Sequence, residues 1–129
     1  MNIGAVSSKS GLPAKTIRYY EEIRLITPDR TANGYRNFSD THLHKLAFLQ
    51  RARGLGFSIE DCRVLLSLYE DTTRASSDVK TMAQEHLGKI LQKITELQAM
   101  RATLFELVNK CQGDDRPDCP ILKGLAGET

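Results

Sequence analysis

The feature that most constrains this chain is a continuous helix-forming run from about residue 78 to residue 110. Apolar residues in this run recur at alternating steps of four and three, with an interruption at Arg101, and form a seam of Ile90, Ile94, Leu97, Leu104 and Val108. A repeat near 3.5 residues is typical of a helix that pairs with another helix along one stripe. Such a helix would be roughly 50 Å long, too long for the core of a chain this small to enclose. We therefore expect a paired coiled coil, and the seam alone leaves the direction of pairing open.

Charge is distributed unevenly along the 129 residues, although the net charge is only +2. Residues 1–58 contain nine Lys and Arg against four Asp and Glu, whereas residues 59–129 contain nine against twelve. A basic first part on a neutral-to-acidic body is typical of a protein that binds a polyanion such as nucleic acid. Chance clustering is the alternative on this evidence alone.

Several classes of protein are disfavoured by what the sequence does not contain. No apolar run approaches the roughly 18 residues of a membrane span, and no signal pattern opens the chain. The expected compartment is the cytoplasm, where cysteines are usually reduced thiols. There is no nucleophile–base pair, phosphate-binding loop or framed pair of carboxylates, so we do not expect an enzyme.

Two short helices joined by a glycine turn are predicted at the N-terminus. The first covers residues 3–9, Gly11 supplies the turn, and the second begins near Pro13 and extends to Glu22. This arrangement is a helix-turn-helix. On the second helix Ile17 and Tyr20 can pack inward, and the outward face carries Lys15, Arg18 and Tyr19. These three residues suit phosphates and base edges in the major groove of DNA; a solvated basic face is the alternative.

A β-hairpin is predicted next, because Asn33-Gly34 is a strong signal for a tight turn between strands. Residues 25–28 are expected to form the first strand and residues 35–38 the second. The hairpin would be a wing with phosphate-binding side chains near its tip, and we assign Arg30, Tyr35 and Arg36 to DNA binding.

A second pair of helices follows the wing. Ser39 is expected to cap a helix that extends to about Arg53, and Ser58 to open another through Tyr69, in a sequence that resembles a capping box. Arg53 and Phe57 lie at the connection and are further predicted DNA contacts. Cys62 falls on an apolar helix face and is predicted to be a core residue.

Two cysteines, Cys111 and Cys119, flank an acidic loop after the long helix. Zinc prefers four ligands, and the loop offers only two thiols with carboxylates. Cu(I) is soft and can be bound by two thiolates, so the ligand count favours a monovalent soft ion. A redox-active disulfide and a pair of inert thiols are the alternatives.

The order of these parts resembles the MerR family of transcriptional regulators. The resemblance is carried by the string Ile17-Arg18-Tyr19-Tyr20-Glu21-Glu22, by Asn33-Gly34-Tyr35-Arg36 and by residues 53–58. One departure is Arg24, where the family usually has Gly, and we expect a modified turn there because a left-handed non-Gly residue is strained. The resemblance predicts a mainly α fold with four parts. These are a winged helix-turn-helix DNA-binding domain (1–70), a linker (71–77), a dimerisation helix in an antiparallel coiled coil (78–110), and a metal-binding loop and tail (111–129).

The terminal loop is similar to that of the copper-responsive branch, the CueR- and HmrR-like regulators. That resemblance implies Cys111 and Cys119 as ligands of Cu(I), with Ag(I) and Au(I) as further candidates. It also implies a Ser at the start of the partner's long helix, here Ser76 or Ser77, with Lys80 nearby. The implied function is a homodimer that binds double-stranded promoter DNA at a palindrome and distorts it so that RNA polymerase transcribes copper efflux genes. The alternative is the same fold sensing thiol redox state or a divalent metal.

Overall fold

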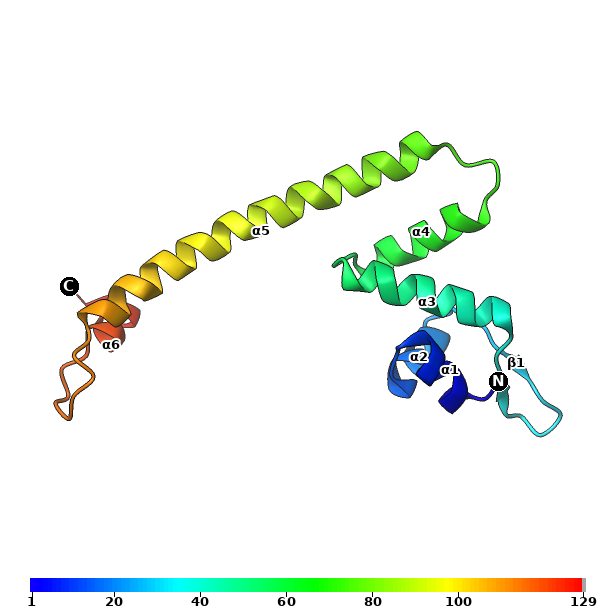
Figure 1. Cartoon of the computed structure of the whole chain (residues 1–129), viewed down its shortest axis with the longest axis horizontal. Coiled ribbons are helices and arrows are strands. Elements are labelled where there is room, and N and C mark those ends of the chain that lie inside the picture. The colour runs from blue at the N-terminus through cyan, green and yellow to red at the C-terminus, as the bar shows by residue number, and fades with distance from the viewer. Residues whose placement is uncertain (129) are drawn as a thin grey trace. The chain divides into compact units, whose positions relative to one another are not determined.

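The computed structural model describes residues 1–128 and is mainly helical, as predicted (Figure 1). The chain divides into two compact units, one covering Met1–Val79 and the other beginning at Lys80. The first unit contains the elements α1 (Ile3–Ser10), α2 (Ala14–Glu22), β1 (Asp29–Arg30), β2 (Arg36–Asn37), α3 (Asp40–Gly54) and α4 (Ile59–Glu70). Helix α5 (Ser76–Lys110) begins before the boundary, and α6 (Pro120–Leu125) follows it in the second unit. Within residues 1–128 no helix is both long enough and apolar enough to span a membrane.

Local capping and a glycine turn define the predicted helix-turn-helix of α1 and α2. The Asn2 side chain accepts a hydrogen bond from the Ala5 N–H at 2.8 Å and caps α1. Gly11 takes a left-handed φ of 78° after α1, and its N–H donates to the Ser7 carbonyl at 3.1 Å. A residue with a side chain would be strained in that conformation, so this glycine fixes the turn between the two helices.

The wing is present, but its first strand lies later than the sequence predicts. Leu25 and Ile26 are buried in the core as a connecting loop, and the strand is Asp29–Arg30, so the prediction of a strand at residues 25–28 is wrong. These two apolar residues pack into the core just after α2 and do not form the hydrogen bonds of a β-strand. The second strand, Arg36–Asn37, falls within the predicted range and pairs antiparallel with β1. Gly34 takes a φ of 81° in the connecting turn.

Helices α3 and α4 begin at the two serines that the sequence predicts as caps. The Ser39 hydroxyl accepts from the His42 N–H at 3.3 Å, and His42 Nδ1 accepts from the Ser39 N–H at 2.9 Å, which completes a capping box. Ser58 caps α4 by accepting from the Asp61 N–H at 3.1 Å. Both are standard ways to satisfy the first N–H groups of a helix.

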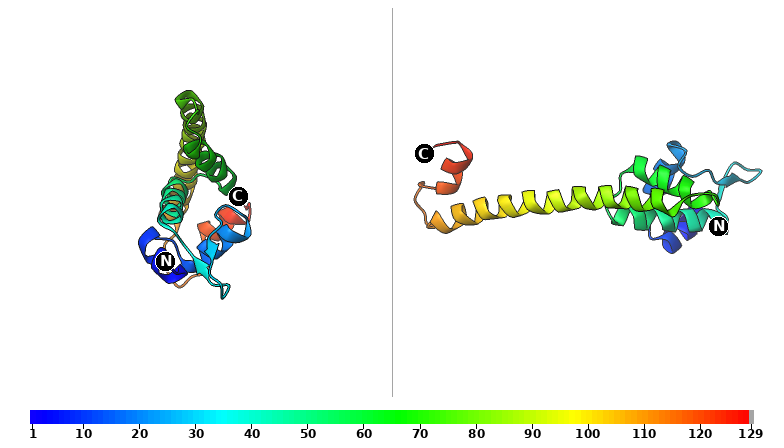
Figure 2. Two further views of the ribbon diagram at one scale, coloured as in Figure 1. Left: turned by 90° about the vertical axis from the view of Figure 1, so that its right-hand side faces the viewer. Right: turned by 90° about the horizontal axis from the view of Figure 1, so that it is seen from above.

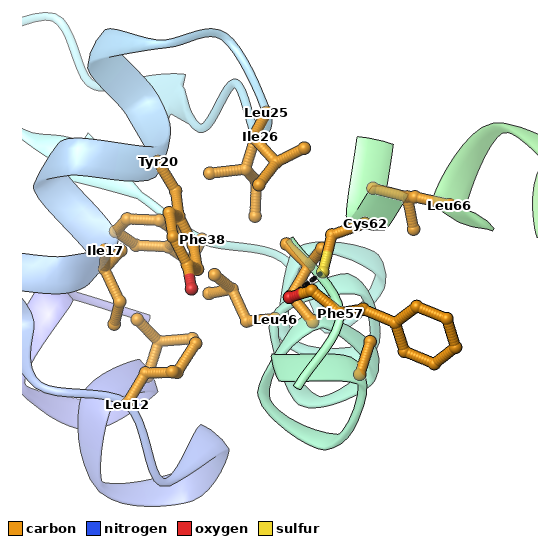
Figure 3. Packing of buried hydrophobic residues seen from close by; sticks show 13 residues of the cluster. Leu12, Ile17, Tyr20, Leu25, Ile26, Phe38, Leu46, Phe57, Cys62 and Leu66 are labelled. Atoms are coloured by element: carbon orange, nitrogen blue, oxygen red, sulfur yellow. Dashed lines mark hydrogen bonds between the residues drawn. The ribbon is translucent and has the colours of Figure 1, made fainter. Parts of the chain in front are cut away.

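The core of the first unit lies between the helix-turn-helix and the α3–α4 pair (Figure 3). Cys62 is completely buried there, as predicted, and its thiol donates to the Phe57 carbonyl at 3.8 Å. Burial raises the pKa of the Cys62 thiol, and the nearby Arg53 opposes that shift. The largest fully buried side chains are Phe38, Ile17, Leu46, Leu49, Val6 and Cys62.

Arg24 follows the C-cap residue of α2 and takes the left-handed conformation, with φ of 59°. The Arg24 N–H donates to Glu21 O at 3.0 Å, and the Leu25 N–H donates to Tyr20 O at 2.8 Å. These two bonds form a Schellman motif with Arg24 in the position that usually holds glycine. The turn is therefore unmodified, and the prediction of a changed turn is wrong. Arg63 of α4 supports this turn by donating to the Ile23 carbonyl at 2.8 Å.

Helix α5 is one continuous helix (Figure 2). It is 35 residues long and contains no buried residue in the single chain. The seam residues are exposed, from 38% for Ile90 to 54% for Leu104. Helix α5 begins at Ser76, two residues before the predicted start, so Ser76 and Ser77 belong to its first turn.

Candidate functional site

The outward face of α2 carries the three predicted DNA-contacting residues. Lys15, Arg18 and Tyr19 are exposed, whereas Ile17 and Tyr20 on the opposite face are buried. Tyr19 is 48% exposed. The helix therefore separates core residues from cationic and phenolic groups as predicted. This arrangement suits insertion into the major groove, and the DNA contacts themselves remain predictions.

The wing is joined to the recognition helix by ion pairs to Glu21. Its carboxylate accepts hydrogen bonds from both Arg30 and Arg36, and only 18% of the Glu21 side chain is exposed. Arg30 also donates to the Gly34 carbonyl at 3.1 Å, which ties the turn to β1. Two residues predicted only as DNA contacts thus also set the position of the wing. Tyr35, at 72% exposed, is the predicted wing residue most open to a ligand.

The connection between α3 and α4 presents Arg53 but not the ring of Phe57. Arg53 is exposed and donates to the Phe57 carbonyl at 2.6 Å, while Phe57 itself is 8% exposed and belongs to the core. A DNA contact made by the Phe57 ring does not fit this burial, because the ring is already packed. Burial raises the pKa of Tyr20 beneath this connection, and Arg53 partly opposes that shift.

Cys111 and Cys119 come together at the end of α5, with 3.9 Å between their sulfur atoms. Both thiols are free and half-buried. This separation is far longer than the roughly 2.05 Å of a disulfide bond. A metal–thiolate bond is about 2.3 Å long in zinc sites, so one ion can contact both sulfur atoms. The structure thus brings together the two predicted ligands, which are eight positions apart in sequence.

The acidic loop is held by its own ion pairs. Arg116 donates to both oxygens of Asp114 through its backbone and side chain, at 2.7–3.0 Å. Lys123 of α6 pairs with Asp118 at 2.9 Å. Among residues 1–128 there is no group of three or more His, Cys, Asp and Glu side chains that could hold a metal ion. Cys111 and Cys119 are the two sulfur atoms that the described residues bring together here.

The N-terminal end of α6 affects the pKa of the second thiol, that of Cys119. Cys119 is the N-cap residue of α6, and the backbone N–H of Leu122 lowers the pKa of the Cys119 thiol. The N–H of Ile121 and the Cys111 thiol lower it further, while desolvation and Asp118 oppose the shift. A lower thiol pKa favours the thiolate, which is the form that binds metal.

The residues predicted beside the metal, Ser76, Ser77 and Lys80, all lie at the start of α5. Lys80 and Cys111 are separated by 30 residues of continuous helix, about 45 Å at 1.5 Å per residue. One chain therefore cannot bring Lys80 to its own cysteine pair. Their predicted role requires a second chain.

Sequence reasoning missed two residues that organise the DNA-binding unit. The sequence places Glu21 only within a motif, although a carboxylate between Arg18 and the arginines of the wing is a signal of charge pairing. Arg63 donates to the carbonyl groups that end α2, a tertiary contact across 40 positions that no local pattern indicates.

Comparison with known proteins decides the family. The family described as MerR HTH family regulatory protein matches residues 1–68, and the one described as MerR, DNA binding matches residues 43–107. The HTH-type transcriptional regulator HmrR of Rhizobium leguminosarum bv. viciae is 61% identical over 126 residues, covering 98% of each protein. This chain belongs to the MerR family. It is accordingly a DNA-binding transcription regulator and not an enzyme.

Other relatives of this MerR-family chain include one further regulator of the same kind and two proteins whose name or title mentions a metal. CueR of Salmonella typhimurium is 46% identical over 128 residues, 98% of this chain and 93% of that protein. Heavy metal-dependent transcription regulator 2 of Rhizobium meliloti is 51% identical over 127 residues, 98% of this chain and 86% of that protein. Among solved structures, a Ralstonia metallidurans transcription regulator in complex with lead(II) has a TM-score of 0.81 at 28% identity, covering 97% of this chain and 98% of that one.

Proposed function

We propose that this MerR-family regulator senses a monovalent soft metal ion, Cu(I) above all, through Cys111 and Cys119. The observation that carries the proposal is the pair of free thiols 3.9 Å apart, with no third donor grouped beside them among the described residues. Relatives named HmrR, CueR and heavy metal-dependent regulator support metal sensing in general. Two thiolates suit Cu(I), Ag(I) or Au(I), whereas a divalent ion such as zinc would lack ligands.

The protein acts as a homodimer in this proposal. The exposed seam of α5 supports it, because an apolar stripe this long on a single helix is unfavourable in water. Pairing α5 with the antiparallel α5 of a second chain covers the stripe. It also brings the partner's Ser76, Ser77 and Lys80 toward the cysteine loop. A monovalent ion bound by two thiolates carries a net charge of −1, which the positive end of the partner's helix and Lys80 stabilise.

The dimer binds a palindromic promoter through its two recognition helices and wings, using Lys15, Arg18 and Tyr19 with Arg30, Tyr35, Arg36 and Arg53. Metal binding then favours a conformation that distorts the promoter so that RNA polymerase engages both of its elements. Bending a site of this size costs about 1–6 kcal/mol, so the metal must bias two protein conformations by a comparable amount. Because its target is promoter DNA, we place the protein in the cytoplasm.

The test is a reporter gene under the target promoter in cells that carry Cys111→Ser and Cys119→Ser together. We expect metal-free DNA binding to be retained and copper induction to be lost. Cys62→Ala is the matched control, since it removes a thiol from the core and leaves the loop intact. Copper induction that survives the double substitution would refute the assignment of the loop.

A divalent metal is the second candidate, and a solved relative favours it. The similar Ralstonia metallidurans regulator is named as a complex with lead(II), a divalent ion, and this supports the second candidate. Induction of the reporter by lead or mercury but not by copper would support this candidate. Induction by an oxidant in the presence of a copper chelator would instead indicate a redox switch.

A further inference from the structure

Helix α6 packs against α5 at a glycine. A Cβ atom added to Gly124 would lie 2.8 Å from Leu107 Cδ2 and 3.2 Å from Leu107 Cδ1. Real Cβ atoms essentially never lie this close to another atom, so a methyl group at Gly124 requires either the end of the Leu107 side chain or α6 itself to shift. Leu107 is half-buried, whereas its neighbours Glu106 and Val108 are exposed. The methyl groups of Leu107 therefore lie directly over the backbone of α6.

The backbone conformation of Gly124 gives no other reason for a glycine. Gly124 is within α6 and is not one of the residues with positive φ in the described chain. Glycine inside a helix is disfavoured relative to alanine, and α6 is only six residues long. The missing side chain is thus explained by the close approach of the two helices.

In sequence, the two residues of this contact lie shortly before Cys111 and shortly after Cys119. Leu107 precedes Cys111 by four residues, and Gly124 follows Cys119 by five. Cys111 continues from the last turn of α5, while Cys119 is the residue that opens α6. The Leu107–Gly124 contact therefore joins the two helices that carry the thiols, and the 112–118 loop needs only to connect them.

We propose that Gly124 is a positioning residue of the metal site. Its missing side chain lets α6 pack on Leu107, and this packing holds Cys119 Sγ opposite Cys111 Sγ. The inference rests on the proposed function, because it assigns the cysteine pair to metal. Lys123, which pairs with Asp118, and the Glu128 N–H, which donates to Lys123 O at 2.9 Å, hold α6 at its two ends but do not set its distance from α5.

Gly124→Ala tests this proposal because helix propensity and the close approach to Leu107 predict opposite changes in Cu(I) affinity. If helix propensity dominates, alanine stabilises α6 and Cu(I) affinity stays the same or rises. If the close approach dominates, alanine pushes α6 away from Leu107 and Cu(I) affinity falls. We expect a fall of about tenfold, the lower end of the range for groups that orient metal ligands, and a larger fall for Gly124→Val.

A double-substitution cycle with Leu107→Ala separates the contact from a general effect on α6. Leu107→Ala removes the three atoms nearest to the added methyl group, so in that background Gly124→Ala should leave Cu(I) affinity unchanged or raise it. Gly88→Ala is the matched control. It adds a methyl group to α5 where, apart from the adjacent backbone of α5 and the two neighbouring residues, no described heavy atom lies within 4 Å of the new Cβ, and it should not change affinity in a dimer verified by size exclusion.

The measurement is competition for Cu(I) with a chelator, using the full-length reduced protein, with metal-free promoter binding and circular dichroism as checks of the fold. Equal affinity of wild type and Gly124→Ala would overturn the inference and leave the proposed function standing. An equal loss from Gly124→Ala in both backgrounds would also overturn it. Absence of Cu(I) binding by the wild type would instead refute the proposed function.

Discussion

Replacing Glu21 by glutamine should weaken the link between the recognition helix and the wing. Its carboxylate accepts from Arg30 on β1 and from Arg36 on β2, and the side chain is only 18% exposed. Glutamine keeps the shape and one acceptor but removes the charge that both guanidinium groups share. The substitution therefore tests the ion pairs and leaves the packing of α2 intact.

The size of the effect follows from the exposure of the partners. A hydrogen bond to a charged group contributes about 1.5–3 kcal/mol when buried, and an exposed ion pair contributes about 0–1 kcal/mol. The Arg36 side chain is 29% exposed and that of Arg30 is 46% exposed, so screening reduces both interactions. We expect Glu21→Gln to lower the free energy of unfolding of the first unit by about 1–2 kcal/mol in total.

Glu21→Gln should have opposite effects on binding to random DNA and on specific binding to the target promoter. Two arginines released from Glu21 become available to phosphates, so binding to random DNA should strengthen and its dependence on salt should steepen. Binding to the target promoter should weaken relative to random DNA, because the wing is no longer held on α2. Fluorescence anisotropy with both DNAs at several salt concentrations measures this ratio. Glu22→Gln is the control, since Glu22 is exposed on the same helix and forms no ion pair within residues 1–128. The reasoning is refuted if the two variants have the same stability and the same specificity ratio.

Three further predictions concern other parts of the chain. Arg24→Gly should raise the free energy of unfolding in urea by about 1 kcal/mol, because it relieves the left-handed strain at φ of 59°; Arg24→Ala should not, and a gain from alanine would contradict this explanation. Ile94→Glu should produce monomers in sedimentation experiments, since it places a charge in the exposed seam of α5; an unchanged dimer would show that the seam is not the interface. Arg18→Ala should lower affinity for the target promoter by about 1–3 kcal/mol without changing Cu(I) affinity; an equal loss on every DNA sequence would indicate a phosphate contact instead.

Features that depend on local sequence could be predicted, and the structure agrees with them. The caps at Ser39 and Ser58, the glycine turn at Gly11 and the amphipathic face of α2 all follow from interactions within a few residues. Local patterns also misled in one place. Residues 25–28 have the composition of a strand, but Leu25 and Ile26 are used to fill the core.

Features that depend on distant contacts could not be predicted. The pairing of Glu21 with two wing arginines, the support of the α2 terminus by Arg63, and the contact between Gly124 and Leu107 join positions between 9 and 40 residues apart. For Arg24 the sequence indicates a strained left-handed residue. It does not indicate that hydrogen bonds of the Schellman motif and from Arg63 maintain the turn despite that strain. Cys111 and Cys119 were identified by residue type and by family resemblance, and their proximity is then provided by the packing of α6.

In the proposed function, two thiolates bind one monovalent ion. X-ray absorption at the copper edge of the reduced dimer loaded with Cu(I), with Zn(II) affinity measured in parallel, tests it most directly. Two sulfur ligands per Cu(I), and Zn(II) bound much more weakly, is the predicted result. Three or four ligands per metal ion, or a preference for Zn(II), would contradict the account and indicate a divalent sensor.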